Sequence, residues 1–377
     1  MRLSHTQRGI AVITVLMALA IAVLICSEVI SRVYASVKRS ENYFNTQQAW
    51  EYALGGEALA REVLAADFEK DRLSSAPIDH LHEKWAQPLP KMTVANGDIA
   101  VEIYDAQARL NLNNLIDQSG SIQSSQVGVL QRLMTFLGMQ THYADMAARW
   151  ASYENDTENM YDSDKINYRA ADTQFGSVSE LRLLRDMRLE EYRRVAPYLS
   201  ALPVPVHINI NTAPEPVLVA LTDGSEQSMS AVKDFIAQRQ QQEVGFTSTE
   251  AFSNLLDAGQ GDDIIGDDLL SGDSDNGSIE APSESVDEGE NEVEGETEND
   301  SNAVLGTSSE YFEVRVIANY GKSKVWLVST LFRDNETGEI MLLSRDTSQR
   351  FLFGNLYSKN NGANKDKKAK PDKEIDK

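Results

Sequence analysis

Oxygen-bearing side chains gather in one short stretch of this 377-residue chain, residues 154–164. The stretch reads Glu-Asn-Asp-Thr-Glu-Asn-Met-Tyr-Asp-Ser-Asp and has neither helical nor strand periodicity. A hard cation such as Ca²⁺ takes about six to eight oxygen ligands in flexible geometry, which a loop of this composition can offer. We take Asp156, Asp162 and Asp164 as the candidate ligands. The EF-hand pattern is not met, because its central glycine and final glutamate are missing, so a solvated acidic loop is an equally good interpretation of these residues alone.

Residue types that carry catalysis show no comparable clustering. The five histidines stand at positions 5, 80, 82, 142 and 207, and none has metalloprotease spacing or accompanies a nucleophile elbow. His80 and His82 with Glu83 offer a second metal group, but a solvated loop explains them more simply. There is no glycine-rich phosphate loop. The sequence therefore predicts no catalytic residues and no enzymatic activity.

The acidity of the chain is local. The net charge is −23, but 17 Asp and Glu residues lie between positions 257 and 300, and removing that block leaves a net charge of −6. The block is also rich in Gly and Ser and poor in aromatic residues, a composition typical of disorder. We expect no nucleic-acid partner, since the phosphate backbone attracts basic surfaces.

The N-terminus predicts a membrane segment. Residues 10–30 are almost entirely apolar, close to the length of about 20 residues that a spanning helix needs. Arg2 and Arg8 precede this segment, which favours a cytoplasmic N-terminus and a periplasmic location for the bulk of the chain. We therefore expect a single-pass protein of a bacterial inner membrane, held through Ile10–Ile30.

A cleavage site stands on the unusual side of this apolar segment. An ordinary signal peptide is cut after its apolar core, whereas here the natural cut point, Gly9, comes before it. This order of parts resembles that of type IV prepilins and pseudopilins. The resemblance implies that a prepilin peptidase cuts after Gly9 and methylates the new N-terminal residue, Ile10.

The rest of the chain predicts an α+β fold. Helical periodicity continues beyond the membrane to about Phe68, and alternating residues predict a strand over 97–105. A mostly helical block occupies 121–256, and three further strands are predicted at 311–319, 324–333 and 339–345. Capping boxes mark three helix starts in the block, at Ser177–Glu180, Thr212–Glu215 and Thr247–Glu250. The strands suffice for one antiparallel sheet packed on the long helix, with the helical block inserted between them.

Several motifs resemble the minor pseudopilin called protein K of the type II secretion system. They are Trp85-Ala-Gln-Pro, Asp105-Ala-Gln, Arg109-Leu-Asn-Leu-Asn-Asn-Leu and Ile208-Asn-Ile-Asn-Thr-Ala-Pro. The resemblance implies a pseudopilin fold with a large inserted all-α domain, calcium bound in that domain, and two partners, the minor pseudopilins I and J. The last motif also resembles helix-hairpin-helix modules, but the following turn, Thr222-Asp-Gly-Ser-Glu-Gln, is acidic and argues against DNA binding.

These features divide the chain into seven parts. They are a leader (1–9), the transmembrane part of the helix (10–31), the first part of the pseudopilin domain (32–120), the helix-hairpin-helix-like helical insertion (121–256), an acidic disordered loop (257–304), the C-terminal strands (305–357) and a disordered tail (358–377).

One residue departs from the general pseudopilin pattern, and this departure bears on the position of the chain in the pseudopilus. Pseudopilins generally carry Glu at the fifth mature position, which here is Thr14. That Glu neutralises the N-terminal ammonium of another subunit, and a carboxylate in lipid is retained only where it has such a partner. Protein K characteristically lacks it, and the resemblance therefore implies a place at the tip of the pseudopilus.

The expected function is that of a minor pseudopilin that caps the periplasmic pseudopilus and helps to start its assembly, so that folded proteins are exported. Secreted proteins are further expected partners. Two alternatives stay open from the residues: a minor pilin of a type IV pilus or DNA-uptake machine, and an unprocessed single-span protein that binds calcium or DNA.

Overall fold

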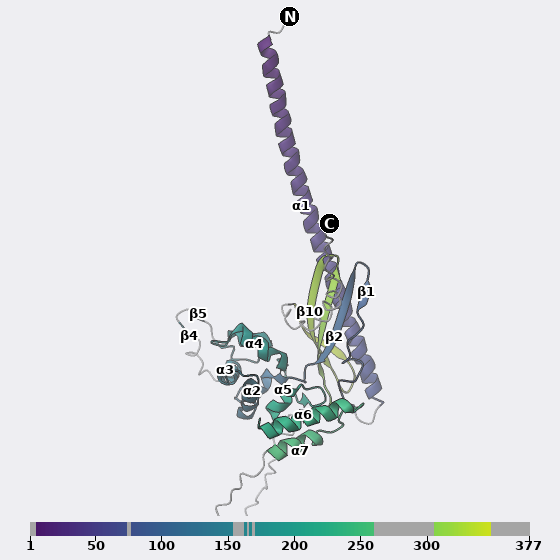
Figure 1. The fold of residues 1–377 in the computed structure, drawn as a ribbon, viewed down its shortest axis with the longest axis vertical. Coiled ribbons are helices and arrows are strands. Elements are labelled where there is room, and N and C mark those ends of the chain that lie inside the picture. The colour runs from purple at the N-terminus through teal and green to yellow at the C-terminus, as the bar shows by residue number, and fades with distance from the viewer. Residues whose placement is uncertain are drawn as a thin grey trace, which may run out of the picture. The chain divides into compact units, whose positions relative to one another are not determined.

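The computed structural model describes residues 5–73, 77–153, 162–163, 166–167, 170–259 and 305–347. Most of the predicted acidic loop and the whole predicted tail lie outside the described residues. The chain forms two compact units (Figure 1). Unit 1 comprises residues 1–69, 84–104 and 313–377, and unit 2 comprises residues 70–83 and 105–312.

Unit 1 is built on one long helix. Helix α1 runs from His5 to Asp71 without interruption, because no proline occurs in it and its single glycine pair is tolerated. At 1.5 Å per residue its 67 residues extend about 100 Å. The expected continuation of the membrane helix into a long soluble helix is confirmed.

The sheet of unit 1 has five strands in the order β1-β2-β9-β10-β11. These are β1 (Met92–Val94), β2 (Gly97–Asp105), β9 (Tyr311–Tyr320), β10 (Ser323–Arg333) and β11 (Ile340–Asp346). The expected strand and three-stranded C-terminal part thus form one sheet, and the short edge strand β1 is an addition. At the β1–β2 turn a side chain on Gly97 would place its Cβ 1.9 Å from the carbonyl oxygen of Asn319, so only glycine fits.

Small residues let α1 lie close to the sheet. Ala49, Ala53, Ala60 and Leu64 recur at helical spacing and are fully buried. A Cβ on Gly56 would lie 2.7 Å from Val316 and 3.1 Å from both Ile99 and Val101. The apolar face predicted for β2 is therefore the face that packs on α1.

A buried carboxylate joins α1 to the edge of the sheet. Glu57 accepts two hydrogen bonds from Arg345 on β11, at 2.7 and 2.9 Å, and one of 2.6 Å from Ser329 on β10. Arg61, one turn along α1, donates at 2.6 Å. Burial alone would raise the pKa of Glu57, but the bonds from Arg345 and Ser329 outweigh it, and the pKa is lowered.

Unit 2 is mainly helical, as predicted for the inserted block. Its α-helices are α2 (Ser124–Phe136), α3 (His142–Ala151), α4 (Leu189–Val195), α5 (Glu215–Leu221), α6 (Glu226–Gln241) and α7 (Glu250–Gly259). The 3₁₀-helix η1 (Leu112–Leu115) precedes α2, and η2 (Val178–Leu183) and η3 (Ala196–Tyr198) lie before and after α4. Two short parallel pairs tie distant segments together: β3 (Leu110–Asn111) with β6 (Leu199–Ser200), and β7 (Ile208–Asn209) with β8 (Leu305–Gly306).

Of the three predicted capping boxes, only the first is present. Ser177 and Glu180 form it, although the helix that they begin is the 3₁₀-helix η2. The prediction at Thr212 is wrong: α5 begins at Glu215 with Pro214 as its N-cap, and the Thr212 hydroxyl instead donates to Asp105 at 2.5 Å. The prediction at Thr247 is also wrong, because α7 begins only at Glu250, so that Glu250 is its first residue and not the third, as a capping box from Thr247 requires.

Candidate functional site

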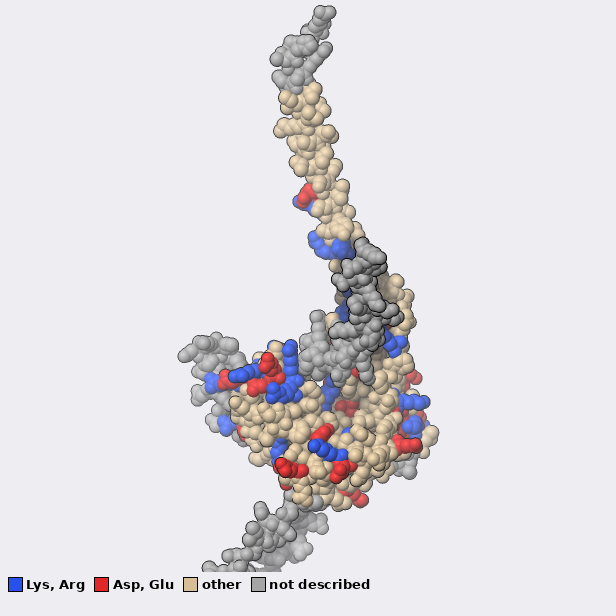
Figure 2. All heavy atoms as spheres, in the orientation of Figure 1, with Lys and Arg blue, Asp and Glu red and all other residues tan. Residues whose placement is uncertain are grey.

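The membrane segment and the predicted cleavage site both lie on α1. The helix passes through Gly9 and Ile10, and every side chain from Val12 to Phe44 except Ala35 and Lys38 is exposed in the isolated chain. Among the described residues, α1 alone is long and apolar enough to cross a membrane. Below the grey end, Figure 2 shows the next part of this helix as a column without Lys, Arg, Asp or Glu. Thr14, at the fifth position after Gly9, is exposed on this column.

Two of the three predicted calcium ligands fall outside the described residues, namely Asp156 and Asp164. The third, Asp162, begins strand β4 (Asp162–Ser163), which pairs with β5 (Ile166–Asn167) through an antiparallel register of Asp162 with Asn167. The predicted calcium site therefore stays a prediction.

Unit 2 contains a group of buried carboxylates that the sequence did not reveal. Oxygen atoms of Asp71, Asp79 and Glu83 lie within 4.8 Å of one another, a spacing that one cation could bridge. Each of these side chains also has protein contacts. Asp79 accepts from the Ser309 amide at 2.7 Å, and Glu83 accepts from the His80 amide at 3.0 Å and lies 4.0 Å from the Lys70 ammonium. The solvated loop expected for His80, His82 and Glu83 is wrong for two of them, because His80 and Glu83 are buried and only His82 is exposed. Desolvation lowers the pKa of His80.

Asp105 is the centre of a second buried network in unit 2. Its carboxylate accepts from Thr212 at 2.5 Å, from Ser309 at 2.6 Å and from Asn209 at 3.1 Å, and also from the Gln107 amide at 2.7 Å. Burial raises the pKa of Asp105 although these bonds oppose the shift. The motif residues around positions 105 and 208–214 thus hold three chain segments together, and their role is structural.

Asparagine side chains serve the same purpose in the neighbouring motif. Asn113 donates to the carbonyls of Phe175 and Leu202, at 3.0 and 2.8 Å, and accepts from the Phe175 amide at 2.7 Å. Asn211 makes a matching pair of bonds with the backbone of Phe246, at 2.9 and 2.8 Å. An amide group suits this task because it donates and accepts at once.

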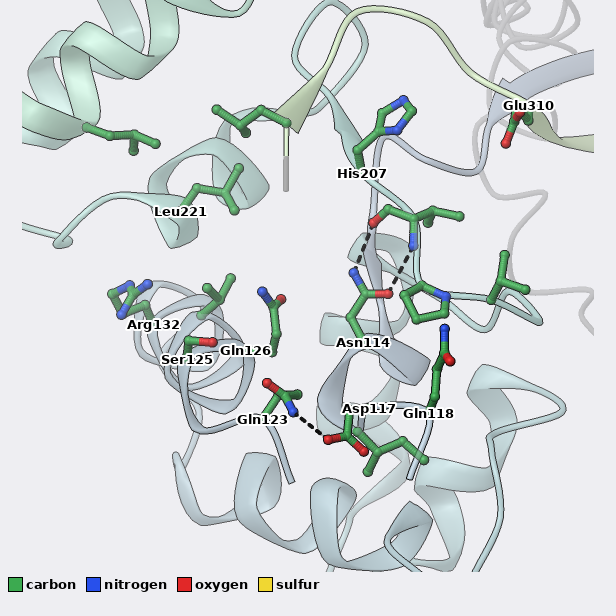
Figure 3. A pocket seen from close by; sticks show the side chains of 17 residues that line it. Asn114, Asp117, Gln118, Gln123, Ser125, Gln126, Arg132, His207, Leu221 and Glu310 are labelled. Atoms are coloured by element: carbon green, nitrogen blue, oxygen red, sulfur yellow. Dashed lines mark hydrogen bonds between the residues drawn. The ribbon is translucent and has the colours of Figure 1, made fainter. Parts of the chain in front are cut away.

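An open cleft of about 750 Å³ lies in unit 2 (Figure 3). We call it the α2 cleft. It is lined by Asn114, Ile116, Asp117, Gln118, Gln123, Ser125, Gln126, Val129, Arg132, Val204, Pro205, Val206, His207, Leu221, Leu256, Leu305 and Glu310. Its walls therefore come from segments far apart in the sequence, which is why no local pattern predicted it. The side chain of Asn114 is already hydrogen-bonded to the backbone of Val206, at 2.9 and 3.3 Å.

Comparisons with known proteins agree on one family. Two family models, both described as type II secretion system protein K, match residues 108–204 and 208–271. The chain is 31% identical over 356 residues to type II secretion system protein K of Pseudomonas aeruginosa, covering 91% of this chain and 93% of the relative. It is also 31% identical over 264 residues to type II secretion system protein K of Pectobacterium carotovorum, covering 65% of this chain and 78% of the relative.

A solved structure has a similar fold. It is the crystal structure of the GspK-GspI-GspJ complex from the type 2 secretion system of enterotoxigenic Escherichia coli. One of its chains superposes with a TM-score of 0.60 and 21% identity, covering 83% of this chain and 99% of that one.

Proposed function

This chain belongs to the type II secretion system protein K family and is a minor pseudopilin of that system; we propose that it caps the tip of a periplasmic pseudopilus and helps to start its assembly. The family assignment rests on the length of the similarity, which extends over 93% of the Pseudomonas relative. This similarity favours type II secretion over a type IV pilus or DNA uptake. The proposed role is structural, without catalysis by this chain.

The stem of α1 supports both membrane anchoring and assembly. Apolar side chains from Val12 to Ile30 are exposed in the isolated chain, so they need lipid before assembly and other helices afterwards. The partners proposed for them are the minor pseudopilins I and J, since the related structure is a complex with two such proteins. The charge distribution around the span favours the bacterial inner membrane with the N-terminus in the cytoplasm.

Two features support the tip position. Thr14 cannot offer the carboxylate by which a subunit reaches the ammonium of another. Unit 2 adds a large compact body between β2 and β9 in the sequence, and every subunit that repeats along a fibre would have to accommodate such a body. At the tip the ammonium of this chain is met by the Glu of a neighbouring subunit, and position 14 faces no free N-terminus.

Processing by a prepilin peptidase is the step that can be tested first. Mass spectrometry of the chain from its native membrane should show a mature N-terminus at methylated Ile10, which requires a cut after Gly9. A Gly9→Leu variant should stay unprocessed, since the small residue at the cut is lost, and should fail to restore secretion in a deletion strain. An intact Met1, or a cut beyond the apolar segment, would contradict the proposal.

Calcium is proposed as the ligand of the 154–164 loop, supported by its oxygen-rich composition. A structural ion stabilises the folded state by mass action. The melting temperature of the full chain should therefore fall with EDTA and recover with added calcium, and Asp156→Asn with Asp162→Asn should remove this response. An unchanged melting temperature would count against a structural calcium site.

A further inference from the structure

Strand β11 forms one edge of the sheet of unit 1. We propose that this edge is a docking site for residues 351–357 of the same chain, which pair with β11 as a further antiparallel strand. The chain leaves the sheet at the end of β11, and residues 348–377 lie outside the described residues. The inference concerns the sheet alone, so it stands independently of the proposed place of the chain in the pseudopilus.

The edge at β11 is long, apolar and exposed. Among the described strands β11 pairs with β10 alone. Its seven residues begin with Ile-Met-Leu-Leu, and Met341 and Leu343 are 47% and 42% exposed. An edge strand leaves backbone N–H and C=O groups open to another strand, and proteins commonly protect it by shortness, Lys or Pro. The opposite edge strand, β1, has only three residues, whereas β11 has no such protection.

The sequence that follows β11 contains a segment suited to this edge. Residues 351–357 read Phe-Leu-Phe-Gly-Asn-Leu-Tyr, and five of these seven residues are large and apolar. Aromatic residues are enriched in strands, and the segment has the same length as β11. From Ser358 onward the chain is polar and charged, with Ile375 as its one large apolar residue. The apolar segment is therefore a discrete unit between a polar link and a polar tail.

The link between β11 and the segment determines how the two can pair. It is the four-residue stretch Thr-Ser-Gln-Arg at 347–350, and four-residue loops are common connections in β-hairpins. With this link Asp346 stands opposite Phe351, and Gly354 comes opposite Leu343. Leu343 is the extra residue of a β-bulge, since the register with β10 shifts there, and glycine is often found where a strand is irregular. The short link also keeps the segment at the edge at a high effective concentration.

The same register places an aromatic ring beside an exposed apolar side chain. Ser329 and Arg345 are a cross-strand pair, and both bind Glu57 of α1, so they face that helix. Because side chains alternate along a strand, Met341 on the far side of the bulge faces away from α1. Phe353 of the docked segment would face the same way. Its ring would cover part of Met341 and remove apolar surface from water, which favours docking.

A disulfide between β11 and the segment tests the pairing in the full-length chain. Ser344→Cys with Phe353→Cys joins two opposite positions, in a chain whose own cysteine is removed by Cys26→Ser. Opposite residues of antiparallel strands have Cα atoms about 4.5–5.5 Å apart, within disulfide reach. After mild oxidation of the membranes, we expect mass spectrometry of unreduced digests to find this disulfide within one chain. Ser344→Cys with Leu356→Cys is the matched control, because its cysteines would lie about 10 Å apart and should stay reduced.

Truncation gives a second readout that needs no cysteine. Deleting residues 351–377 should speed the amide hydrogen exchange of β11 about tenfold, because backbone groups on its outer side lose their partners. Deleting residues 358–377 is the matched control and should leave this exchange unchanged. The inference would be overturned if the Ser344–Phe353 disulfide did not form, if both cysteine pairs were linked equally, or if the disulfides joined two copies of the chain. Exchange of β11 that neither truncation alters would overturn it as well.

Discussion

Glu57 is a charged residue on the face of α1 that packs on the sheet, and the side chains around it explain why it is tolerated. A buried carboxylate is costly unless its hydrogen-bond acceptors are satisfied, and Arg345, Ser329 and Arg61 supply four bonds. Three of the four come from β10 and β11. We infer that Glu57 fixes the last two strands of the sheet, β10 and the edge strand β11, to α1.

The Glu57→Gln variant should lower the free energy of unfolding by about 1–3 kcal/mol, because the arginines lose a charged acceptor in a buried position. Glu51→Gln is the matched control. Glu51 is exposed on the same helix and accepts one bond of 3.3 Å from Gln47, so its loss should cost under about 0.5 kcal/mol. Urea denaturation of the processed protein measures both, and equal effects would contradict the role of Glu57.

The pH dependence of the stability difference between wild type and Glu57→Gln gives a second check on the role of Glu57. The folded state lowers the pKa of Glu57 below its ordinary value of 4.5. A lowered carboxyl pKa stabilises the folded state above the unfolded value, and the gain is lost as pH falls through the folded value. The difference in free energy of unfolding between wild type and Glu57→Gln should thus be constant from neutral pH down to about pH 5. It should shrink below about pH 4.

Single residues in unit 2 also have partners that lie far away in the sequence. The motifs at positions 105–107 and 208–214 led to the correct family, but their role as a buried network needed the fold. The Thr212 hydroxyl is bound by Asp105, a residue 107 positions earlier, so a local capping pattern could not reveal its partner. All three asparagines of residues 111–114 bind backbone some 60–90 positions away, which no local pattern shows.

At the scale of elements, the adjacent glycines of α1 provide a matched pair. A Cβ on Gly55 would have no atom within 4 Å, whereas a Cβ on Gly56 would lie 2.7 Å from the fully buried Val316. Gly55→Ala should stabilise the protein by up to about 1 kcal/mol through helix propensity. Gly56→Ala should destabilise it by about 1–3 kcal/mol, since a stiff core residue must shift. Thermal unfolding of both variants checks this, and effects of the same sign would show that α1 does not approach the sheet as closely as described.

Elements with a strong pattern were predicted well. Strand β2 spans the predicted residues 97–105 because its alternation is clean and a glycine turn precedes it. Strand β1 was missed because three residues next to a proline-rich loop carry too little pattern to be recognised. The α2 cleft could not be predicted at all, since its walls come from α2, α5, α7, β8 and the loops at 114–118 and 204–207.

In the molecule as a whole, the order of the segments along the chain explains its proposed role as a pseudopilin. An apolar stem precedes a sheet, and a second compact unit is inserted between β2 and β9. In the proposed function the stem serves membrane anchoring and assembly into a fibre, and unit 2 sets this subunit apart from one that repeats along the fibre. The proposed function therefore depends above all on the position of the chain in the pseudopilus.

Immunogold electron microscopy of isolated pseudopili tests that position most directly. Antibodies would be raised against unit 2, and fibres from a strain that lacks the chain would serve as the control for unspecific label. We expect label at one end of each fibre only, and fewer fibres in the deletion strain because assembly starts poorly. Label repeated along the length of the fibres, or at neither end, would contradict the proposal that this pseudopilin caps the tip.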